Sequence, residues 1–144
     1  MKNISTEIII NARISKIWDT LLDFEAYPSW NPFIQKIEGV PQINEKLKVT
    51  IKPLGGKSMI IRPVIQKISD YQLCWKGGLF INGLFDGVHQ FQLIQETGNA
   101  VKLIHSETFT GLISKPVFAL VGKSTQIGFE QMNIALKELC EAGK

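Results

Sequence analysis

The chain of 144 residues contains only two cysteines, Cys74 and Cys140, and they fall in different predicted elements. Two thiols provide no disulfide framework, which excludes the small secreted scaffolds that disulfides hold together. No apolar run approaches the ~18 residues that a membrane-spanning helix needs. Residues 1–3 lead directly into a strand pattern rather than into a signal peptide. We therefore expect a cytoplasmic protein without an integral membrane segment.

Runs of one charge are also missing. The 16 basic and 13 acidic residues give a net charge of +3, but no stretch of consecutive lysine or arginine residues occurs. Proteins that bind nucleic acid usually concentrate basic residues in such stretches. We therefore expect no nucleic-acid partner.

Motifs for nucleophilic catalysis and phosphate binding are absent too. No serine or cysteine lies in a recognisable nucleophile motif, which leaves acyl-enzyme chemistry without support. Residues 77–83 are rich in glycine but lack the lysine and the spacing of a phosphate-binding loop. We interpret this stretch as a wide hairpin connection. The alternative is that Leu79, Phe80 and Ile81 form an apolar lip at the entrance of a pocket.

Hydrophobic periodicity indicates about seven strands, and the length suits a single domain over residues 1–144. Pro63 favours an edge or a bulge in the fourth strand. Two short helices follow the first strand, and the first of them spans residues 15–22. Short links between strands favour an antiparallel sheet and the α+β class. The predicted strands are residues 6–11, 33–38, 47–51, 59–68, 71–76, 84–95 and 100–110.

The last third of the chain predicts one long amphipathic helix, over residues 115–142, that can cover the concave face of the sheet. Gly122 and Gly128 interrupt it, at a cost of about 1 kcal/mol each relative to alanine. They indicate either a locally weak or kinked helix or a place where small residues leave room for a ligand. The apolar face of the helix comprises Phe118, Val121, Thr125, Phe129, Met132, Leu136 and Leu139.

Strand parity directs three polar side chains toward the core, because alternate residues of a strand point to the same face. His89, His105 and Glu107 fall on the apolar faces of the two strands that hold them. The face that holds His89 also holds Phe85, Gly87, Phe91 and Leu93. The face that holds His105 and Glu107 also holds Val101, Leu103 and Phe109.

The register of these two strands follows if they form a hairpin whose apolar faces coincide. A three-residue loop, 97–99, sets His89 opposite Glu107 and Phe91 opposite His105, with Asn99 able to take the left-handed conformation. A five-residue loop sets His89 opposite Phe109 instead. We prefer the shorter loop, because it pairs a buried carboxylate with a buried imidazole, and an unpaired buried charge costs several kcal/mol.

Such a pair has several possible roles. A carboxylate fixes the tautomer of a neighbouring imidazole, which suits a general acid or base in enolisation and aldol chemistry. The pair can equally hold the polar head of a bound molecule, or it can be structural and satisfy only itself. Two histidines and one glutamate are also a partial zinc ligand set, but no fourth group is evident and we expect no metal.

Residues 23–34, Asp-Phe-Glu-Ala-Tyr-Pro-Ser-Trp-Asn-Pro-Phe-Ile, place four aromatic rings and two prolines between a helical and a strand pattern. A segment so rich in large rings must fold back on a core or line a cavity. It resembles the opening of the START-like, helix-grip superfamily, also called SRPBCC, of the polyketide cyclase/dehydrase type. Further similar segments are residues 73–77 (Leu-Cys-Trp-Lys-Gly), 85–91 (Phe-Asp-Gly-Val-His-Gln-Phe) and 105–111 (His-Ser-Glu-Thr-Phe-Thr-Gly).

The resemblance covers essentially the whole chain and implies a single START-like domain, residues 1–144. Its fold would be a curved antiparallel sheet around the long C-terminal helix, with a deep apolar cavity between them. Proteins of this superfamily bind sterols, fatty acids, phospholipids, quinones or polyketides, and a minority catalyse cyclisation or aromatisation. No catalytic signature is common to them all, so the resemblance transfers no active site.

We therefore expect a protein that binds a small hydrophobic molecule, such as a lipid, a sterol-like compound, a quinone or a polyketide, and that needs no cofactor. Its polar anchor would be His89, His105 and Glu107. One alternative is a polyketide-cyclase-like enzyme in which His89 and Glu107 act as the acid–base pair. Another is a protein-interaction module with a collapsed pocket. The expected walls are Phe24, Trp30, Phe33, Trp75, Phe91, Phe109, Phe129 and Met132.

Overall fold

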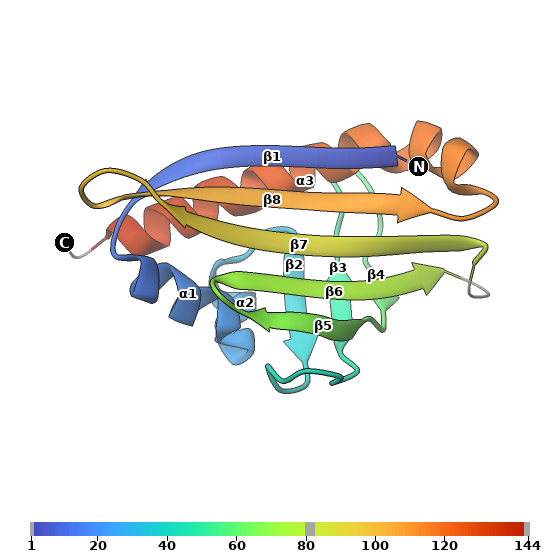
Figure 1. Cartoon of the computed structure of the whole chain (residues 1–144). Coiled ribbons are helices and arrows are strands. Elements are labelled where there is room, and N and C mark those ends of the chain that lie inside the picture. Colours follow the sequence, from blue (N-terminus) through green and yellow to red (C-terminus); the bar gives the residue numbers. More distant parts are fainter. Residues whose placement is uncertain (1, 80–82, 143–144) are drawn as a thin grey trace.

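Figure 1 shows the computed structural model of the chain, which describes residues 2–79 and 83–142. A five-stranded antiparallel sheet has the order β1-β8-β7-β6-β5, and a three-stranded antiparallel sheet has the order β2-β3-β4. The predicted α+β class is confirmed. The strands are β1 (Lys2–Asn11), β2 (Ile34–Glu38), β3 (Lys48–Ile51), β4 (Met59–Ile61), β5 (Val64–Ser69), β6 (Gln72–Leu79), β7 (Phe85–Gln95) and β8 (Ala100–Thr110).

The described residues thus form eight strands rather than about seven, because the predicted strand 59–68 is divided at Pro63. β4 and β5 are edge strands of two different sheets, so the chain passes from one sheet to the other at this proline. Proline has no N–H group to donate to a strand ladder, which is why it stands at such a break.

Three short helical segments follow β1: α1 (Ile14–Leu22), the 3-10 helix η1 (Phe24–Ala26) and α2 (Tyr27–Trp30). Phe24 and Tyr27 are buried, and the Tyr27 hydroxyl donates to the Leu21 carbonyl at 2.7 Å. Burial raises the pKa of this phenol. Asn31 Oδ1 accepts the backbone N–H groups of residues 33 and 34, each at 2.9 Å. The aromatic segment therefore folds back on the core and is held there by its own hydrogen bonds.

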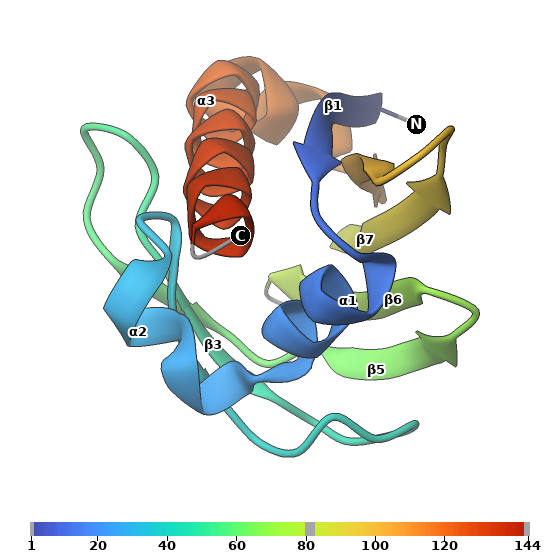
Figure 2. The same cartoon turned by 90° about the vertical axis from the view of Figure 1, so that its left-hand side faces the viewer.

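The two sheets curve around the helix α3 (Ser114–Glu141), as Figure 2 shows. This is the helix-grip arrangement that the sequence predicted. Phe129, Met132 and Leu136 are buried as expected. Val121 and Leu139 are 37% and 42% exposed, so the predicted apolar face was wrong for them. The packed face of α3 occupies the middle and C-terminal part of the helix and turns away from these two residues near its ends.

Gly128 allows α3 to approach the aromatic segment. A methyl group at this position would overlap with the ring of Phe33. The same ring meets Phe129 edge-on, with 5.6 Å between the ring centroids. The room that this glycine leaves is therefore filled by a core side chain and not by a ligand.

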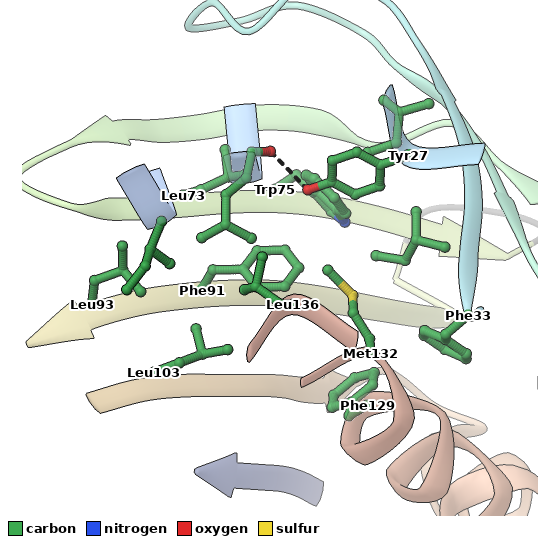
Figure 3. Close-up of a cluster of buried hydrophobic side chains, with 14 of the residues drawn as sticks. Tyr27, Phe33, Leu73, Trp75, Phe91, Leu93, Leu103, Phe129, Met132 and Leu136 are labelled. Carbon is green, nitrogen blue, oxygen red and sulfur yellow. Dashed lines mark hydrogen bonds between the residues drawn. The ribbon is translucent and has the colours of Figure 1, made fainter. Parts of the chain in front are cut away.

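The main core lies between the C-terminal half of α3 and the concave face of the large sheet (Figure 3). Apolar side chains of β6, β7 and β8 meet those of the helix there, and each is at most 5% exposed. This tight packing fixes where the helix lies relative to β7 and β8, and so where the polar side chains of those strands lie. The residues in contact are Leu73, Phe91, Leu93, Leu103, Met132 and Leu136.

The hairpin of β7 and β8 has the predicted register. His89 lies opposite Glu107, and Phe91 lies opposite His105. The prediction was wrong about the left-handed residue of the loop, which is Gly98, with φ of 67°. Glycine adopts this conformation without the steric cost that asparagine bears.

The glycine-rich stretch was predicted as a connection from residue 77 onward, but β6 continues through Gly77 and Gly78 to its end at Leu79. Gly77 pairs with Gly87 of β7. These residues therefore belong to the sheet and contribute backbone without side chains. Phe80 and Ile81, which make up most of the suggested apolar lip, lie outside the described residues.

Candidate functional site

A cavity of ≈ 160 Å³ lies beneath the N-terminal half of α3. Both sheets and the helix contribute to its walls. Among the described residues that line it, Glu107 carries the only ionisable side chain and Thr125 the only aliphatic hydroxyl. Large apolar walls with few polar groups are typical of sites for hydrophobic molecules. The apolar lining includes Ile51 and Met59 of the small sheet, Phe85 and Phe109 of the large sheet, and Val117 and Val121 of α3.

Glycines of the large sheet also line the cavity, namely Gly77, Gly78 and Gly87. Gly87 has a specific reason to lack a side chain, since a methyl group there would collide with the carboxylate of Glu107. The two residues lie on neighbouring strands and face the same side. Gly87 thus leaves the space that the carboxylate occupies between the cavity and His89.

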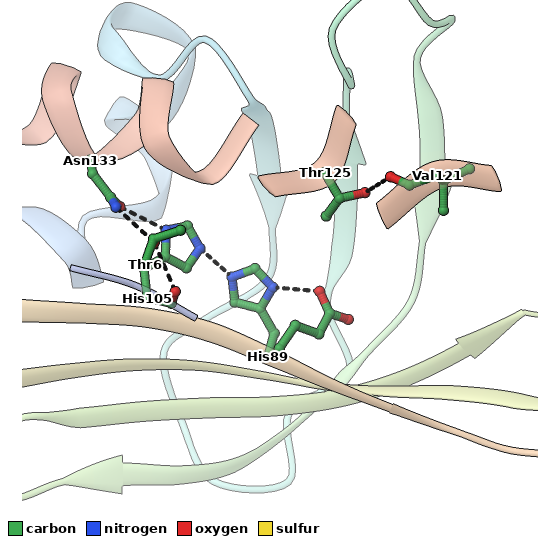
Figure 4. A network of polar contacts seen from close by, with 7 residues as sticks. Thr6, His89, His105, Val121, Thr125 and Asn133 are labelled. Carbon is green, nitrogen blue, oxygen red and sulfur yellow. Dashed lines mark hydrogen bonds and ion pairs between the residues drawn. The ribbon is translucent and has the colours of Figure 1, made fainter. Parts of the chain in front are cut away.

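A chain of hydrogen-bonded side chains runs from the cavity into the core (Figure 4). Glu107 Oε1 lies 3.1 Å from His89 Nδ1, and His89 Nε2 lies 2.8 Å from His105 Nε2. His105 Nδ1 lies 2.8 Å from Asn133 Oδ1 of α3. Asn133 Nδ2 donates to Thr6 Oγ1 of β1 at 2.9 Å. Four elements of the fold are therefore joined by one polar chain.

The proton positions in this chain can be derived from its inner end. The Thr6 hydroxyl donates its hydrogen to the His105 carbonyl at 2.9 Å, so it can only accept from Asn133. The amide of Asn133 must then present its oxygen to His105 Nδ1, which carries a hydrogen. His105 Nε2 is left as the acceptor, and His89 Nε2 must be the donor to it.

One proton remains to be shared at the outer end of the chain. His89 Nδ1 and Glu107 Oε1 face each other, and only one hydrogen can lie between them. The pair is either an imidazolium with a carboxylate or a neutral imidazole with a carboxylic acid. This shared proton lies next to the cavity, because Glu107 lines it.

His105 is fully buried, and its pKa is held well below the usual value of 6.5. Burial is the main cause, and the neighbouring His89 adds to it, whereas the hydrogen bond to Asn133 acts in the opposite direction. The ring of His105 stacks on Phe129, with 4.1 Å between centroids. His105 is therefore the neutral, fixed end of the histidine pair.

Trp75 lines the cavity and holds a buried polar group beside it. Its side chain is 2% exposed and lines the cavity, and its ring stacks on His89 with 5.1 Å between centroids. The indole Nε1 is buried and has no hydrogen-bond partner among the described residues. In Figure 3 this nitrogen lies at the end of the ring that is nearer to Phe33, another cavity residue. A buried N–H group without a partner costs free energy that a bound acceptor would recover.

The structure divides the residues that the sequence predicted for the site. Four of them line the cavity: Phe33, Trp75, Glu107 and Phe109. Five others are buried, two of them in the polar chain and three in the apolar core: His89, His105, Phe91, Phe129 and Met132. Phe24 is buried away from the cavity lining, and Trp30 lines a separate hollow at the surface near α1.

Sequence reasoning missed three residues of this site. Thr6 shares the strand parity of the apolar residues Ile4 and Ile10, so parity along β1 was a signal for an inward hydroxyl. Asn133 lies within the buried face of α3, next to Met132, and is itself 2% exposed. The helical spacing placed Thr125 on the apolar face of the long helix, but it gave no sign that the hydroxyl belongs to a binding site.

No group of three or more histidine, cysteine or acidic side chains in the described part of the chain is placed to hold a metal ion. None of the helices described is long and apolar enough to cross a membrane.

The family model described as polyketide cyclase/dehydrase and lipid transport matches residues 1–141. The chain belongs to this family. The resemblance drawn from residues 23–34 and the later segments is thereby confirmed. A comparison with curated protein sequences finds no significant match.

Solved structures agree with this family fold. A hypothetical protein from Helicobacter pylori is 13% identical, with a TM-score of 0.79 and coverage of 97% of this chain and 88% of that one. A START superfamily protein from Mycobacterium smegmatis is 19% identical, with a TM-score of 0.75 and coverage of 96% and 97%. The di-domain ARO/CYC StfQ from the steffimycin biosynthetic pathway is 11% identical, with a TM-score of 0.71 and coverage of 96% and 50%. At these identities the likeness concerns the fold alone.

Proposed function

We propose that the chain acts as one START-like domain that binds a small, neutral, hydrophobic molecule in the cavity beneath α3. The observation that carries the proposal is the position of Glu107, whose carboxylate is the only ionisable group among the described residues lining an otherwise apolar cavity. We place this binding in the cytoplasm, where two unpaired thiols such as Cys74 and Cys140 persist.

The volume of the cavity supports a small ligand. An apolar cavity of about 150 Å³ holds one benzene ring, and the cavity here measures ≈ 160 Å³. Within the range of ligands expected from the sequence, this favours a molecule of about one ring, such as a quinone-like or aromatic compound. A sterol or a phospholipid would have to enlarge the cavity.

The polar groups of the cavity support a particular pattern on the ligand. Glu107 Oε1 is engaged by His89, which leaves Oε2 free to accept a hydrogen bond. Thr125 donates its hydrogen to the Val121 carbonyl at 2.9 Å, so its oxygen can also accept. Trp75 Nε1 needs an acceptor. A ligand that fits this pattern has a hydroxyl group, which can donate to Glu107 or to Thr125, and a carbonyl group for Trp75, and it carries no negative charge.

Three probes of similar size test this proposal by isothermal titration calorimetry. 4-Hydroxyacetophenone has the hydroxyl and the carbonyl, acetophenone lacks the hydroxyl, and 4-hydroxybenzoate carries a carboxylate. We expect 4-hydroxyacetophenone to bind about tenfold more tightly than acetophenone, as for a lost hydrogen bond to a charged group. We expect 4-hydroxybenzoate to bind worst, since no cation lines the cavity in the described residues.

The variant Glu107→Gln should remove the preference for the hydroxyl while leaving acetophenone binding unchanged. Asp86→Asn is a matched control, because Asp86 lies on β7 with its side chain outside the cavity lining. Equal binding of all three probes to the wild type would contradict the role of Glu107 as the polar anchor of the ligand. Absence of binding by all three would favour the protein-interaction module with a collapsed pocket.

The shared proton of His89 and Glu107 favours a second candidate function, acid–base catalysis on a bound ketone. In this reaction the Glu107 carboxylate would take a proton from the carbon next to the carbonyl. The C–H electron pair would form a C=C bond and the C=O π pair would move to the oxygen, giving an enolate that the Trp75 N–H group is available to stabilise. The proton would be held on Glu107 Oε2, because His89 already carries a hydrogen on both nitrogens when Glu107 is ionised, and it would exchange with solvent from there.

Exchange of the methyl protons of 4-hydroxyacetophenone in D₂O, followed by NMR, separates the two functions. A catalyst accelerates the exchange above the rate in buffer, and Glu107→Gln abolishes the acceleration. A binding protein holds the probe without accelerating the exchange. The latter result would leave the binding function standing and remove the enzymatic one.

A further inference from the structure

Charge is segregated in two segments that supply residues to the cavity wall. Residues 46–69 and 108–129 together carry eight of the 16 basic residues and none of the 13 acidic ones. The rest of the chain therefore has eight basic residues against thirteen acidic ones. The two segments contain β3, β4, their connection and the first half of α3, and these elements supply cavity residues from Ile51 to Ile61 and from Val117 to Thr125.

Four exposed lysines lie within these two segments next to cavity residues. Lys52 and Lys57 flank the connection of β3 and β4, and Lys115 and Lys123 lie on the first turns of α3. None of the four forms an ion pair within the described part of the chain. Figures 1 and 2 both show this connection beside α3. The lysines therefore lie on two segments that run side by side and both supply cavity residues.

Large apolar side chains project from the same segments into solvent. Leu112 and Leu120 are 87% and 84% exposed, and Leu54 is 54% exposed. We call these three leucines and the four lysines the mouth rim. Leucines exposed to this degree beside an apolar cavity mark a surface that meets an apolar partner.

We propose that the mouth rim docks on an anionic lipid surface, with the cavity facing the membrane. The leucines would enter the region between head groups and acyl chains, and the lysines would pair with anionic head groups. A membrane accounts for both halves of the rim at once, because unpaired cations and protruding leucines alternate along the same two segments. Exchange of the ligand would then occur directly between the bilayer and the cavity.

Co-sedimentation with lipid vesicles tests this docking. One vesicle is pure phosphatidylcholine, and the other is a mixture of phosphatidylcholine and phosphatidylglycerol. We expect the wild type to bind the anionic vesicle at least tenfold more strongly, and we expect added salt to weaken this binding. The double variant Lys115→Glu, Lys123→Glu should bind the anionic vesicle about tenfold less. Leu112→Ser, Leu120→Ser should lose the binding that survives at high salt.

The matched control is Lys16→Glu, Lys76→Glu, which makes the same charge change at exposed lysines outside the mouth rim. It should retain most of the binding. Equal loss in this control would show a general charge effect and overturn the proposal. Equal binding to both vesicles, or no binding to either, would also overturn it and leave an acidic protein as the alternative partner.

The docking goes beyond the proposed ligand binding, and the two can fail separately. Gly87→Ala displaces Glu107 from its place beside the cavity but changes nothing on the mouth rim. This variant should bind anionic vesicles like the wild type, and a clear loss would contradict docking through the rim alone. Vesicle binding without binding of 4-hydroxyacetophenone would support docking through the mouth rim and refute Glu107 as the polar anchor of the ligand. Binding of 4-hydroxyacetophenone without vesicle binding would support the anchor and refute the docking.

Discussion

The two halves of α3 lie against the same pair of sheets, yet the C-terminal half packs tightly on them and a cavity lies beneath the N-terminal half. Phe129, Met132 and Leu136 in the C-terminal half are at most 1% exposed. Val117, Val121 and Thr125 in the N-terminal half line the cavity. The polar chain begins at Asn133 within the packed half and runs through the two histidines to Glu107 at the cavity.

Side-chain size on both partners explains the difference. The C-terminal half of the helix meets large side chains of the sheet, such as Phe91, and fills the space between them. The N-terminal half presents smaller side chains above Gly77, Gly78 and Gly87, so a gap remains over these glycines, although Phe118 reaches Phe109 of β8. The cavity is therefore a consequence of where glycine and valine replace larger residues, within a fold whose other half provides the stability.

The largest expected effect is a difference in stability between substitutions in the two halves of α3. Phe129→Ala should lower the free energy of unfolding by about 3–5 kcal/mol, because it removes a fully buried ring. Val121→Ala is the matched change in the hollow half and should cost less than about 1 kcal/mol, since this side chain is 37% exposed. Denaturation in urea measures both. Similar losses for the two variants would mean that the halves are equally packed.

A pair of glycine substitutions sharpens the comparison. Gly128→Ala places a methyl group against the ring of Phe33 and should destabilise the fold by about 1–3 kcal/mol, despite the better helix propensity of alanine. Gly87→Ala meets only the end of the flexible Glu107 side chain, so the fold should tolerate it.

The same pair should behave in the opposite way in ligand binding. Gly87→Ala should lose the preference for 4-hydroxyacetophenone over acetophenone, and Gly128→Ala should keep it where the protein remains folded. Urea denaturation and calorimetry on both variants check this. A large loss of stability in Gly87→Ala would place that residue in the packed half and contradict our description.

The pH dependence of the free energy of unfolding tests the burial of His105, which lies between Asn133 of the packed half and His89. The pKa of His105 is lower in the folded protein than its usual 6.5, so the unfolded chain takes up the proton first as the pH falls. Stability should therefore fall as the pH drops through about 6.5, by up to about 1.4 kcal/mol per pH unit, and level off below the folded pKa.

His105→Gln keeps a neutral polar side chain but removes this titration. The difference between wild type and variant, measured by urea denaturation from pH 8 to pH 5, should show the slope that belongs to His105. Parallel curves for the two proteins would mean that His105 takes up a proton equally in both states, which its burial and the neighbouring His89 do not allow.

Much of the fold could be predicted from the sequence, because period-two and helical patterns are strong in this chain. The pairing of His89 with Glu107 followed from strand parity. When the apolar faces of two strands coincide, the numbers of paired residues add up to an even value, which restricts the register. Pro63 marked the place where the chain changes sheets, although the division into two sheets was not foreseen.

The site was harder to predict, since parity says which face a side chain occupies but not whether space lies in front of it. Phe91 and Phe109 share their faces with the two histidines, yet only Phe109 lines the cavity. The direct contact of His89 with His105 depends on packing between the strands and α3, and no sequence pattern encodes it. Gly77 and Gly78, two of the three glycines that line the cavity, looked like part of a turn.

A crystal structure of the protein with 4-hydroxyacetophenone tests the central claim most directly. The account predicts the probe beneath the N-terminal half of α3, with its hydroxyl within hydrogen-bond distance of the Glu107 carboxylate and its carbonyl at Trp75 Nε1. A cavity closed by side chains, or a probe bound only at the surface, would contradict it.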